Sequence, residues 1–283
     1  MKLKMKLITA AVALAASAGA NAAMDNLLSG NSSLAFIALD NTGTPISAMM
    51  DLNYNLNDFL PTAMSAPGTH IVWDFNANSL TVNGVAQAIS PTWSGAMSTF
   101  AASAQAAETK WAVIAGDSLT SSVAGDVRYL TTSNDPLATL QTQTKFNLTG
   151  MSLVDGLFNA NNLLQTNPID GSTASAGQAF VNTYSSVGPA FKWSGKFVGD
   201  SFANEGTASK FYMLDTNTGI GSQKALVTQF AAANPTGPAT FSYTAGVLTY
   251  NVAAVPEPSE YALMLAGLGM LGFIARRRLA NRG

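Results

Sequence analysis

Leu34-Ala-Phe-Ile-Ala-Leu39 is followed directly by Asp40-Asn-Thr-Gly43, and a second stretch, Ser47 to Leu56, comes next. A short apolar run that ends in a cluster of turn-forming residues is typical of a β-strand. The two stretches on either side of the turn therefore predict a β-hairpin. This unit decides the fold class, because the same pattern of strand and turn recurs along the chain.

The pattern of strands and turns continues to residue 252. Asn83-Gly84 and Ala245-Gly246 mark two further turns, and Asn-Gly is a strong hairpin signal. Helical propensity and spacing favour a few helices. In the one expected at residues 136–141, Asp135 would be the N-cap and Pro136 the first helical residue. We expect strands at residues 70–75, 79–82, 110–115, 127–132, 209–214, 240–243 and 247–252, and helices at 96–108, 136–141, 150–165 and 176–184. The sequence thus predicts a mainly β (α+β) fold, an antiparallel β-sandwich-like domain with a few surface helices.

Composition restricts the function of this central domain. Residues 23–255 carry seven basic and fourteen acidic side chains, a net charge of about −7, which argues against a surface that binds nucleic acid. The chain has no cysteine, so disulfides, thiolate metal sites and cysteine nucleophiles are excluded. Only 11% of the residues are charged. Asn, Thr, Ser and Gln supply the polar surface instead, a composition that favours an extracellular β-rich domain.

The N-terminus has the three parts of a secretory signal peptide. Three lysines within the first six residues precede an apolar region at 7–20, and Ala20-Asn21-Ala22 offers small residues at alternating positions. We predict that residues 1–22 form a signal helix that is cleaved near Ala22. The alternatives are an uncleaved anchor and a buried core helix.

The C-terminus joins a proline-rich spacer, an apolar segment and a cationic end. Pro256 and Pro258 keep the spacer Val255-Pro256-Glu257-Pro258 extended. Residues 261–275 carry no charge and would form a helix about 22 Å long, short of a hydrocarbon core of about 30 Å. Arginine side chains that reach the headgroups can extend such a span. The segment predicts a C-terminal transmembrane helix, with Arg276, Arg277 and Arg278 as a stop-transfer signal on the cytoplasmic side. The alternative is a buried or amphipathic helix of a soluble domain.

Val255-Pro256-Glu257-Pro258-Ser259, the apolar segment and the terminal arginines together resemble the PEP-CTERM sorting signal. The resemblance implies that the tail is recognised and removed by an exosortase, a membrane-embedded cysteine transpeptidase, and that no residue of this chain is catalytic. Ala35 to Asp40 with its following strand, and Trp111 to Asp117, also resemble exported β-rich proteins that carry this tail. That second resemblance supplies an architecture but no active site.

Other motifs do not assemble a catalytic or metal site. His70 is the single histidine and has no cysteine partners, so we expect a structural or surface role. Asp51 to Asn55 begins like an EF-hand loop, but Leu56 stands where glycine is needed and Thr62 where glutamate is needed. Gly267-Leu-Gly269-Met-Leu-Gly272 matches a dinucleotide motif inside the apolar tail, where small residues instead favour close helix contact with the processing enzyme.

Carbohydrate chemistry stays open at this stage. Paired aspartates could cleave a glycosidic bond, because spacing in sequence does not fix spacing in the fold. Exposed tryptophans could stack on sugar rings, but we expect most of them in the core, namely among Trp73, Trp93, Trp111 and Trp193. A deep cleft with two facing aspartates would indicate a hydrolase. A flat row of exposed aromatic rings would indicate a binding module.

The sequence predicts three regions: a signal peptide at 1–22, a β-rich passenger at 23–254 and a sorting signal at 255–283. We expect a non-enzymatic protein without a cofactor or metal site, exported across the inner membrane and anchored transiently by its tail. It would then be cut near Pro256 to Pro258 and reach the cell envelope or the extracellular space. The expected partners are an exosortase and the exopolysaccharide of a biofilm or floc. The alternatives are a secreted glycoside-acting hydrolase or carbohydrate-binding module with the same tail, and a permanent anchor.

Overall fold

The computed structural model describes residues 24–25, 29–40, 46–89, 93–117, 127–143, 201–216, 222–255 and 258–280. The strands are β1 (Ser33–Asp40), β2 (Ile46–Asn55), β3 (His70–Asp74), β4 (Ser79–Val82), β5 (Val85–Gln87), β6 (Lys110–Asp117), β7 (Arg128–Ser133), β8 (Ala203–Asn204), β9 (Ser209–Asp215), β10 (Leu226–Gln229), β11 (Thr240–Thr244) and β12 (Val247–Asn251). The helices are the 3-10 turn η2 (Leu56–Asp58), α1 (Pro61–Met64), α2 (Ser94–Ala101), α3 (Leu137–Leu140) and α6 (Pro258–Ala280).

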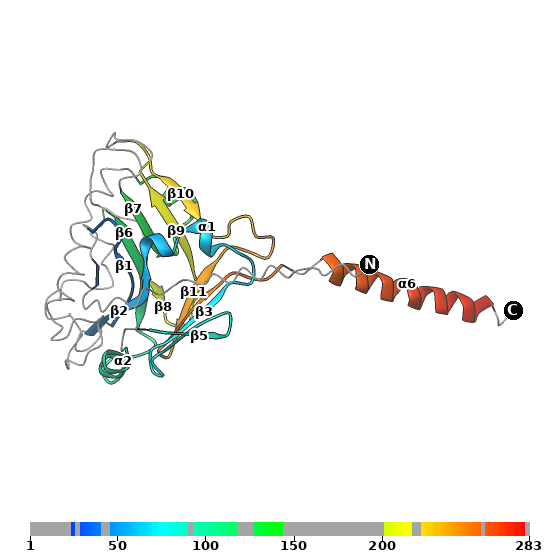
Figure 1. Ribbon diagram of the computed structural model, residues 1–283, viewed down its shortest axis with the longest axis horizontal. Helices are drawn as coiled ribbons and strands as arrows, with labels where there is room; N and C mark the ends of the chain where they lie inside the picture. Colours follow the sequence, from blue (N-terminus) through cyan, green and yellow to red (C-terminus); the bar gives the residue numbers. More distant parts are fainter. Residues whose placement is uncertain are drawn as a thin grey trace.

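All strand pairs among these residues are antiparallel, as the sequence predicts. The strand order is β2-β1-β6-β7-β9-β11-β12-β3-β4-β5, while β8 pairs with β6 and β10 with β9 (Figure 1). The predicted hairpins β1–β2, β6–β7 and β11–β12 are confirmed. Asn83 and Gly84 both have positive φ, 51° and 79°, which is the turn geometry that Asn-Gly favours in a two-residue hairpin.

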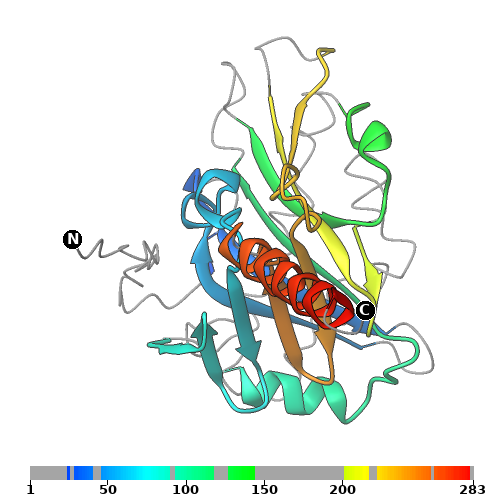
Figure 2. The ribbon, with the colours of Figure 1, turned by 90° about the vertical axis from the view of Figure 1, so that its right-hand side faces the viewer.

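The described strands form one curled sheet, and the predicted sandwich is not confirmed. β9 lies between β7 and β11, and β12 lies between β11 and β3, so the hydrogen bonding continues from each hairpin to the next. Figure 2 shows β3 and β4 in cyan, with the blue β2 curving behind them. A periodic sequence pattern locates strands, but it does not say which strands pair across long separations. Two separate sheets and one curled sheet therefore have the same local signature.

Hydrogen bonds from two tryptophan side chains stabilise the curled form of the sheet. The Trp73 Nε1–H group donates to the Leu52 carbonyl oxygen at 2.8 Å, and the Trp93 Nε1–H group donates to the Asp51 carbonyl oxygen at 2.6 Å. Both indoles are fully buried. Trp73 is on β3, which stands seven places from β2 in the strand order. The Trp73 bond therefore connects distant parts of the sheet, and the Trp93 bond ties the start of α2 to β2. Both satisfy carbonyls of this end strand.

The inside of the curl is an aromatic core. The Phe59 ring lies with its centroid 5.1 to 6.1 Å from five other rings, those of Tyr54, Phe211, Phe230, Phe241 and Tyr250. The opposite face of the sheet is buried too, with Ile37, Ile114 and Leu214 in a second cluster. Burial on both faces explains why Leu34 to Leu39 of β1 are all apolar and do not alternate with polar residues.

The predicted helices are confirmed only in part. α2 ends at Ala101, earlier than the expected residue 108, and α3 is one turn long. Pro136 is the N-cap of α3, with ψ of 145°, so the assignment of Asp135 as cap and Pro136 as first helical residue is wrong. Pro136 itself takes extended backbone, so the helix begins one residue later than expected, at Leu137. The expected helices at 1–22, 150–165 and 176–184 lie outside the described residues.

Asp51 organises a bulge where β1 meets β2. The register changes from Ser33↔Asn55 to Ala35↔Asp51, and Asn53 takes a φ of 60°. The Asp51 carboxylate accepts hydrogen bonds from the Ser33 hydroxyl and the Asn53 N–H, both at 2.7 Å. Burial raises the pKa of Asp51 to about 6, against the lowering effect of these two bonds. Asp51 to Asn55 is thus part of a bulged strand and does not begin an EF-hand loop.

We expect Trp73→Phe to destabilise the fold by about 1–3 kcal/mol, because the Leu52 carbonyl loses its donor inside the core. Hydrogen exchange at the β2 amides should accelerate together with the loss of stability in urea. Trp111→Phe is the matched control, since its indole donates to the Asn204 carbonyl oxygen at 3.0 Å and makes no link to β2. Equal acceleration of the β2 amides in both variants would contradict the assigned closing role.

Asp51 should make stability fall as the pH rises. Its folded pKa of about 6 lies above its ordinary value of 3.8, so the folded state binds the extra proton. Ionisation then costs up to about 3 kcal/mol above pH 6, and the cost disappears as the pH falls toward the ordinary value. Asp51→Asn should be the more stable protein at pH 8, and the difference should vanish near pH 4 in urea unfolding. A difference that does not change with pH would count against this assignment.

Candidate functional site

The C-terminal tail leaves the folded body at one well-defined point. The Val252 N–H donates to the Thr69 carbonyl oxygen at 2.8 Å, and the Gly68 N–H donates to the Val252 carbonyl oxygen at 2.9 Å. The Asn234 side-chain amide donates to the Ala253 carbonyl oxygen at 2.7 Å. Val255, two residues further on, is 38% exposed. The body therefore fixes the chain as far as Ala253 and leaves the start of the tail open to the solvent.

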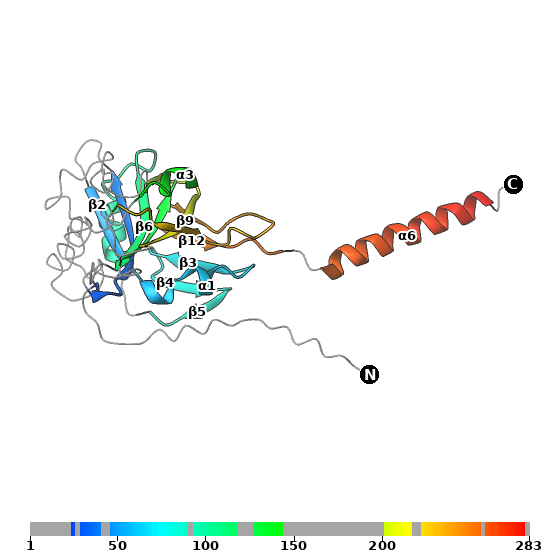
Figure 3. The same ribbon diagram turned by 90° about the horizontal axis from the view of Figure 1, so that it is seen from above.

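The helix α6 extends from this point away from the sheet (Figures 1 and 3). It has 23 residues and continues through the arginines, so it is longer than the predicted apolar segment. A Cβ added at Gly267, Gly269 or Gly272 would meet no atom within 4 Å. Eight large apolar side chains are 48% to 73% exposed, namely Leu263, Met264, Leu265, Leu268, Met270, Leu271, Phe273 and Ile274. The apolar surface of this helix is left uncovered by the body.

The predicted transmembrane helix is not confirmed. Within the part of the chain that the structure describes, no helix combines the length and the apolar character needed to cross a membrane. The uncharged segment, residues 261–275, lies between Glu260 and Arg276. The structure therefore contains an apolar terminal helix in the place where the span was expected.

Some residues of the predicted sorting signal belong to α6, and others lie outside the described residues. Pro258 is the first residue of α6, so the extended spacer is shorter than expected. A proline is compatible with the first helical turn, where its missing N–H has no partner to lose. Arg276, Arg277 and Arg278 belong to the last turns of α6, and the Arg277 side chain is exposed. Pro256 and Glu257, like the signal-cleavage residues Ala20 and Ala22, lie outside the described residues.

Three tryptophans have the core positions that the sequence predicts. Trp73, Trp93 and Trp111 are fully buried, and each indole N–H donates to a backbone carbonyl. None of the three can stack on a sugar from outside. Trp193 lies outside the described residues. His70 is exposed on β3 opposite Asn251, in agreement with its predicted surface role.

Two aspartates lie close together, but an arginine stands between them. Asp117 on β6 pairs in register with Arg128 on β7, and Arg128 pairs with Asp215 on β9. Arg128 Nη2 lies 2.7 Å from the Asp117 carboxylate. Burial raises the pKa of Asp215, although the Arg128 charge opposes this. The ion pair joins Asp117 and Arg128 on neighbouring strands, and Arg128 lies between the two aspartates in the sheet. Among the described residues, no three acidic or histidine side chains are placed to hold a metal ion.

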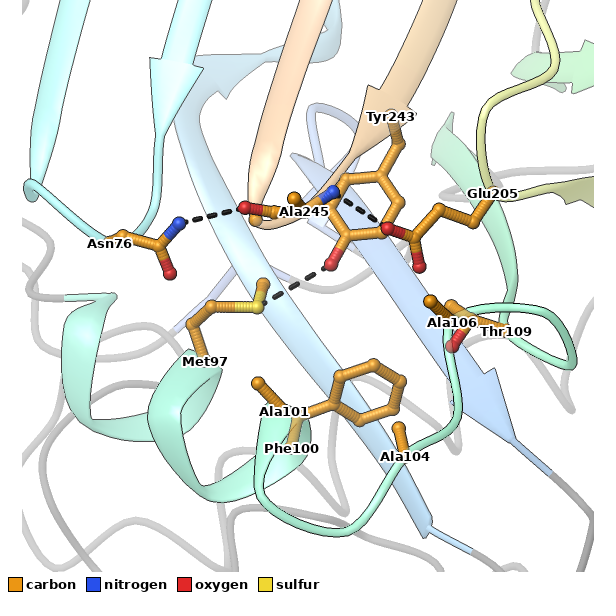
Figure 4. A pocket seen from close by; sticks show the side chains of 11 residues that line it. Asn76, Met97, Phe100, Ala101, Ala104, Ala106, Thr109, Glu205, Tyr243 and Ala245 are labelled. Carbon is orange, nitrogen blue, oxygen red and sulfur yellow. Dashed lines mark hydrogen bonds between the residues drawn. The ribbon is translucent and has the colours of Figure 1, made fainter.

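A cavity of about 250 Å³ lies between α2 and the turn that joins β11 to β12 (Figure 4). Met97 and Phe100 of α2 face Tyr243 across it, and Glu205 and Asn76 stand at its two sides. Sequence reasoning missed this cavity because its lining comes from four separate stretches of the chain. The predicted helix at 96–108 and the Ala245-Gly246 turn were marked by local signals, but their meeting in the fold was not.

Polar groups at the rim of this cavity are held in place by the turn. The Ala245 N–H donates to Glu205 Oε1 at 2.6 Å, and Asn76 Nδ2 donates to the Ala245 carbonyl oxygen at 2.8 Å. Gly246 has a φ of +81°, and a Cβ there would lie 2.4 Å from Asn76 Nδ2, so only glycine fits. The Tyr243 hydroxyl donates to the Met97 sulfur at 3.5 Å. Burial, and next the charge of Glu205, raise the pKa of Tyr243, which keeps the phenol protonated.

The PEP-CTERM protein-sorting motif matches residues 254–278. The chain therefore carries this sorting signal, and it is an exported protein targeted to an exosortase, destined for the cell envelope or the extracellular space. No curated protein and no solved structure matches the chain significantly. The motif begins at the residue after the last one that the body holds by hydrogen bonds.

A chain that ends at Ala254 should be as stable as the full chain. Because α6 leaves its apolar side chains exposed, its removal should change the free energy of unfolding by less than about 0.5 kcal/mol in urea. Val252→Ala is the comparison, since this buried side chain should cost more than about 1 kcal/mol. Loss of about 2 kcal/mol on truncation would show that the tail packs on the body.

Proposed function

We propose that this protein is a non-enzymatic component of the cell envelope or extracellular matrix that acts beside exopolysaccharide in a biofilm or floc. The observation that carries the proposal is the position of the sorting motif, which begins at residue 254, where the hydrogen bonding of the body ends. An enzyme that cuts near Pro256 to Pro258 would release a complete folded body. Residues 23–254 then form the functional passenger, between a signal peptide at 1–22 and a disposable tail.

The uncovered helix α6 supports transient anchoring of the precursor at the membrane. Each large apolar side chain that leaves water contributes roughly 1.5–3 kcal/mol, and eight such side chains on α6 are exposed. Arg276, Arg277 and Arg278 follow the apolar segment and would pair with anionic lipid headgroups. The glycines of α6 leave room for a helix of the processing enzyme to approach closely.

The described side chains of the passenger support a function without catalysis. Asp117 and Asp215, one pair of described aspartates, are separated by Arg128, and three of the four tryptophans that a sugar-binding face would need are in the core. Its net charge of about −7 also favours a soluble matrix component over one that adheres to anionic lipid. A hydrolase or a carbohydrate-binding module with the same tail stays the alternative.

Mass spectrometry of the exported protein tests the proposal. In cells that contain an exosortase, the mature form should begin near Ala23 and lack Arg276–Gly283, and it should fractionate with the extracellular polysaccharide. Glu257→Ala together with Pro256→Ala should leave the tail attached, because the extended recognition segment is lost. Pro238→Ala, a proline in a loop of the body, is the matched control and should be processed normally.

An intact Arg276–Gly283 peptide on the envelope form would exclude processing and indicate a permanent anchor. Normal processing followed by an unchanged distribution in cells that make no exopolysaccharide would exclude the matrix role. Hydrolysis of the polysaccharide by the purified body would favour the hydrolase. These results separate the sorting step from the role of the passenger.

A further inference from the structure

The cavity between α2 and the β11–β12 turn has an apolar interior. Met97, Phe100 and Tyr243 form its buried part, and a set of small side chains completes the wall, namely Ala101, Ala104, Ala106 and Ala245. Binding sites for drug-sized ligands start at about 300 Å³, and a water molecule takes about 30 Å³. A space of about 250 Å³ therefore suits a molecule of only a few heavy atoms.

Glu205 brings a negative charge to the edge of this apolar space. Its backbone is fixed on both sides, because the Glu205 N–H donates to the Thr109 carbonyl oxygen at 3.0 Å and the next N–H, of Gly206, donates to the Tyr243 carbonyl oxygen at 2.8 Å. Oε1 is used by the Ala245 N–H, and within the described residues Oε2 has no partner. A rigid carboxylate with a free oxygen is well placed to accept from a ligand.

No cation of the described lining neutralises Glu205. The residues around the cavity include no lysine, arginine or histidine. Lys110 is close in the sheet, yet its ammonium group donates to the Asn204 side-chain oxygen. The Tyr243 and Phe100 rings add the negative faces that attract organic cations. The negative charge of Glu205 and the apolar lining of the cavity therefore favour a small cation with an apolar body.

We propose that this cavity is a binding site for a small primary alkylammonium ion. The ammonium group donates to Glu205 Oε2, and the alkyl chain lies between Tyr243 and Phe100, against the alanines. The site is separate from the sorting tail and does not depend on the function proposed for the passenger.

Titration of the full, isotope-labelled chain with n-butylammonium, followed by NMR at the Ala245 and Gly246 amides, tests the site. These amides should shift saturably, and n-butanol, the neutral probe of the same shape, should bind at least tenfold more weakly. Glu205→Gln keeps an acceptor for the Ala245 N–H but removes the charge, and it should weaken butylammonium binding at least tenfold. Glu108→Gln, an exposed acid that does not line the cavity, should change the affinity less than twofold.

Ala104→Leu should fill the cavity and abolish binding of both probes while the spectrum stays that of a folded protein. The proposal would be overturned by the absence of a saturable shift with butylammonium in the folded wild type, or by equal affinity in wild type and Glu205→Gln. Butanol or glucose that binds as tightly as butylammonium would likewise overturn it and indicate a site for neutral ligands. Because no readout involves export or processing, failure here leaves the sorting function unaffected.

Discussion

The hydrogen bonds from the Trp73 and Trp93 indoles to the carbonyls of Leu52 and Asp51 are the constraint on which the rest of the structure depends. An antiparallel sheet of this size would expose one face and its end strands if it stayed open. The Trp73 indole links β3 to β2, and the Trp93 indole links the start of α2 to β2, so one face of the sheet is turned inward. Phe59 and its neighbours then fill the enclosed space, so aromatic packing makes up a large part of the core of this exported protein, which has no cysteine.

The curl also decides where the chain leaves the body. β12 pairs with β3 along its whole length, and the residues after it are fixed by Thr69 and Asn234 as far as Ala253. Rigid pairing up to that residue and exposure just beyond it create a sharp boundary between body and tail. A processing enzyme that reads an extended segment benefits from such a boundary, because it does not have to unfold the substrate. Export and folding are thus carried by separate parts of one chain.

The turn that joins β11 to β12 shows how a polar site can arise as a consequence of packing. Gly246 lets Asn76 approach its backbone, and the same turn positions the N–H of Ala245 against Glu205. These contacts stabilise the turn first. They also leave one carboxylate oxygen beside a small apolar space under α2. A sequence pattern cannot mark such a site, because each contributing residue has an ordinary structural explanation when it is read alone.

The sequence by itself determined most of the strands, the Asn-Gly hairpin and the sorting tail, since each depends on neighbouring residues: apolar runs bounded by turns, or a spacer, an apolar segment and arginines in order. The short strands β5, β8 and β10 were not among the strands it predicted. It also placed Trp73, Trp93 and Trp111 in the core, because large apolar groups leave water wherever they can. Only the tertiary structure decided that the strands form one curled sheet, that Arg128 separates Asp117 from Asp215, and that Glu205 meets Tyr243 across a cavity. Those outcomes depend on pairing between residues far apart in the chain, and local propensity carries no information about which distant partners will minimise the free energy together.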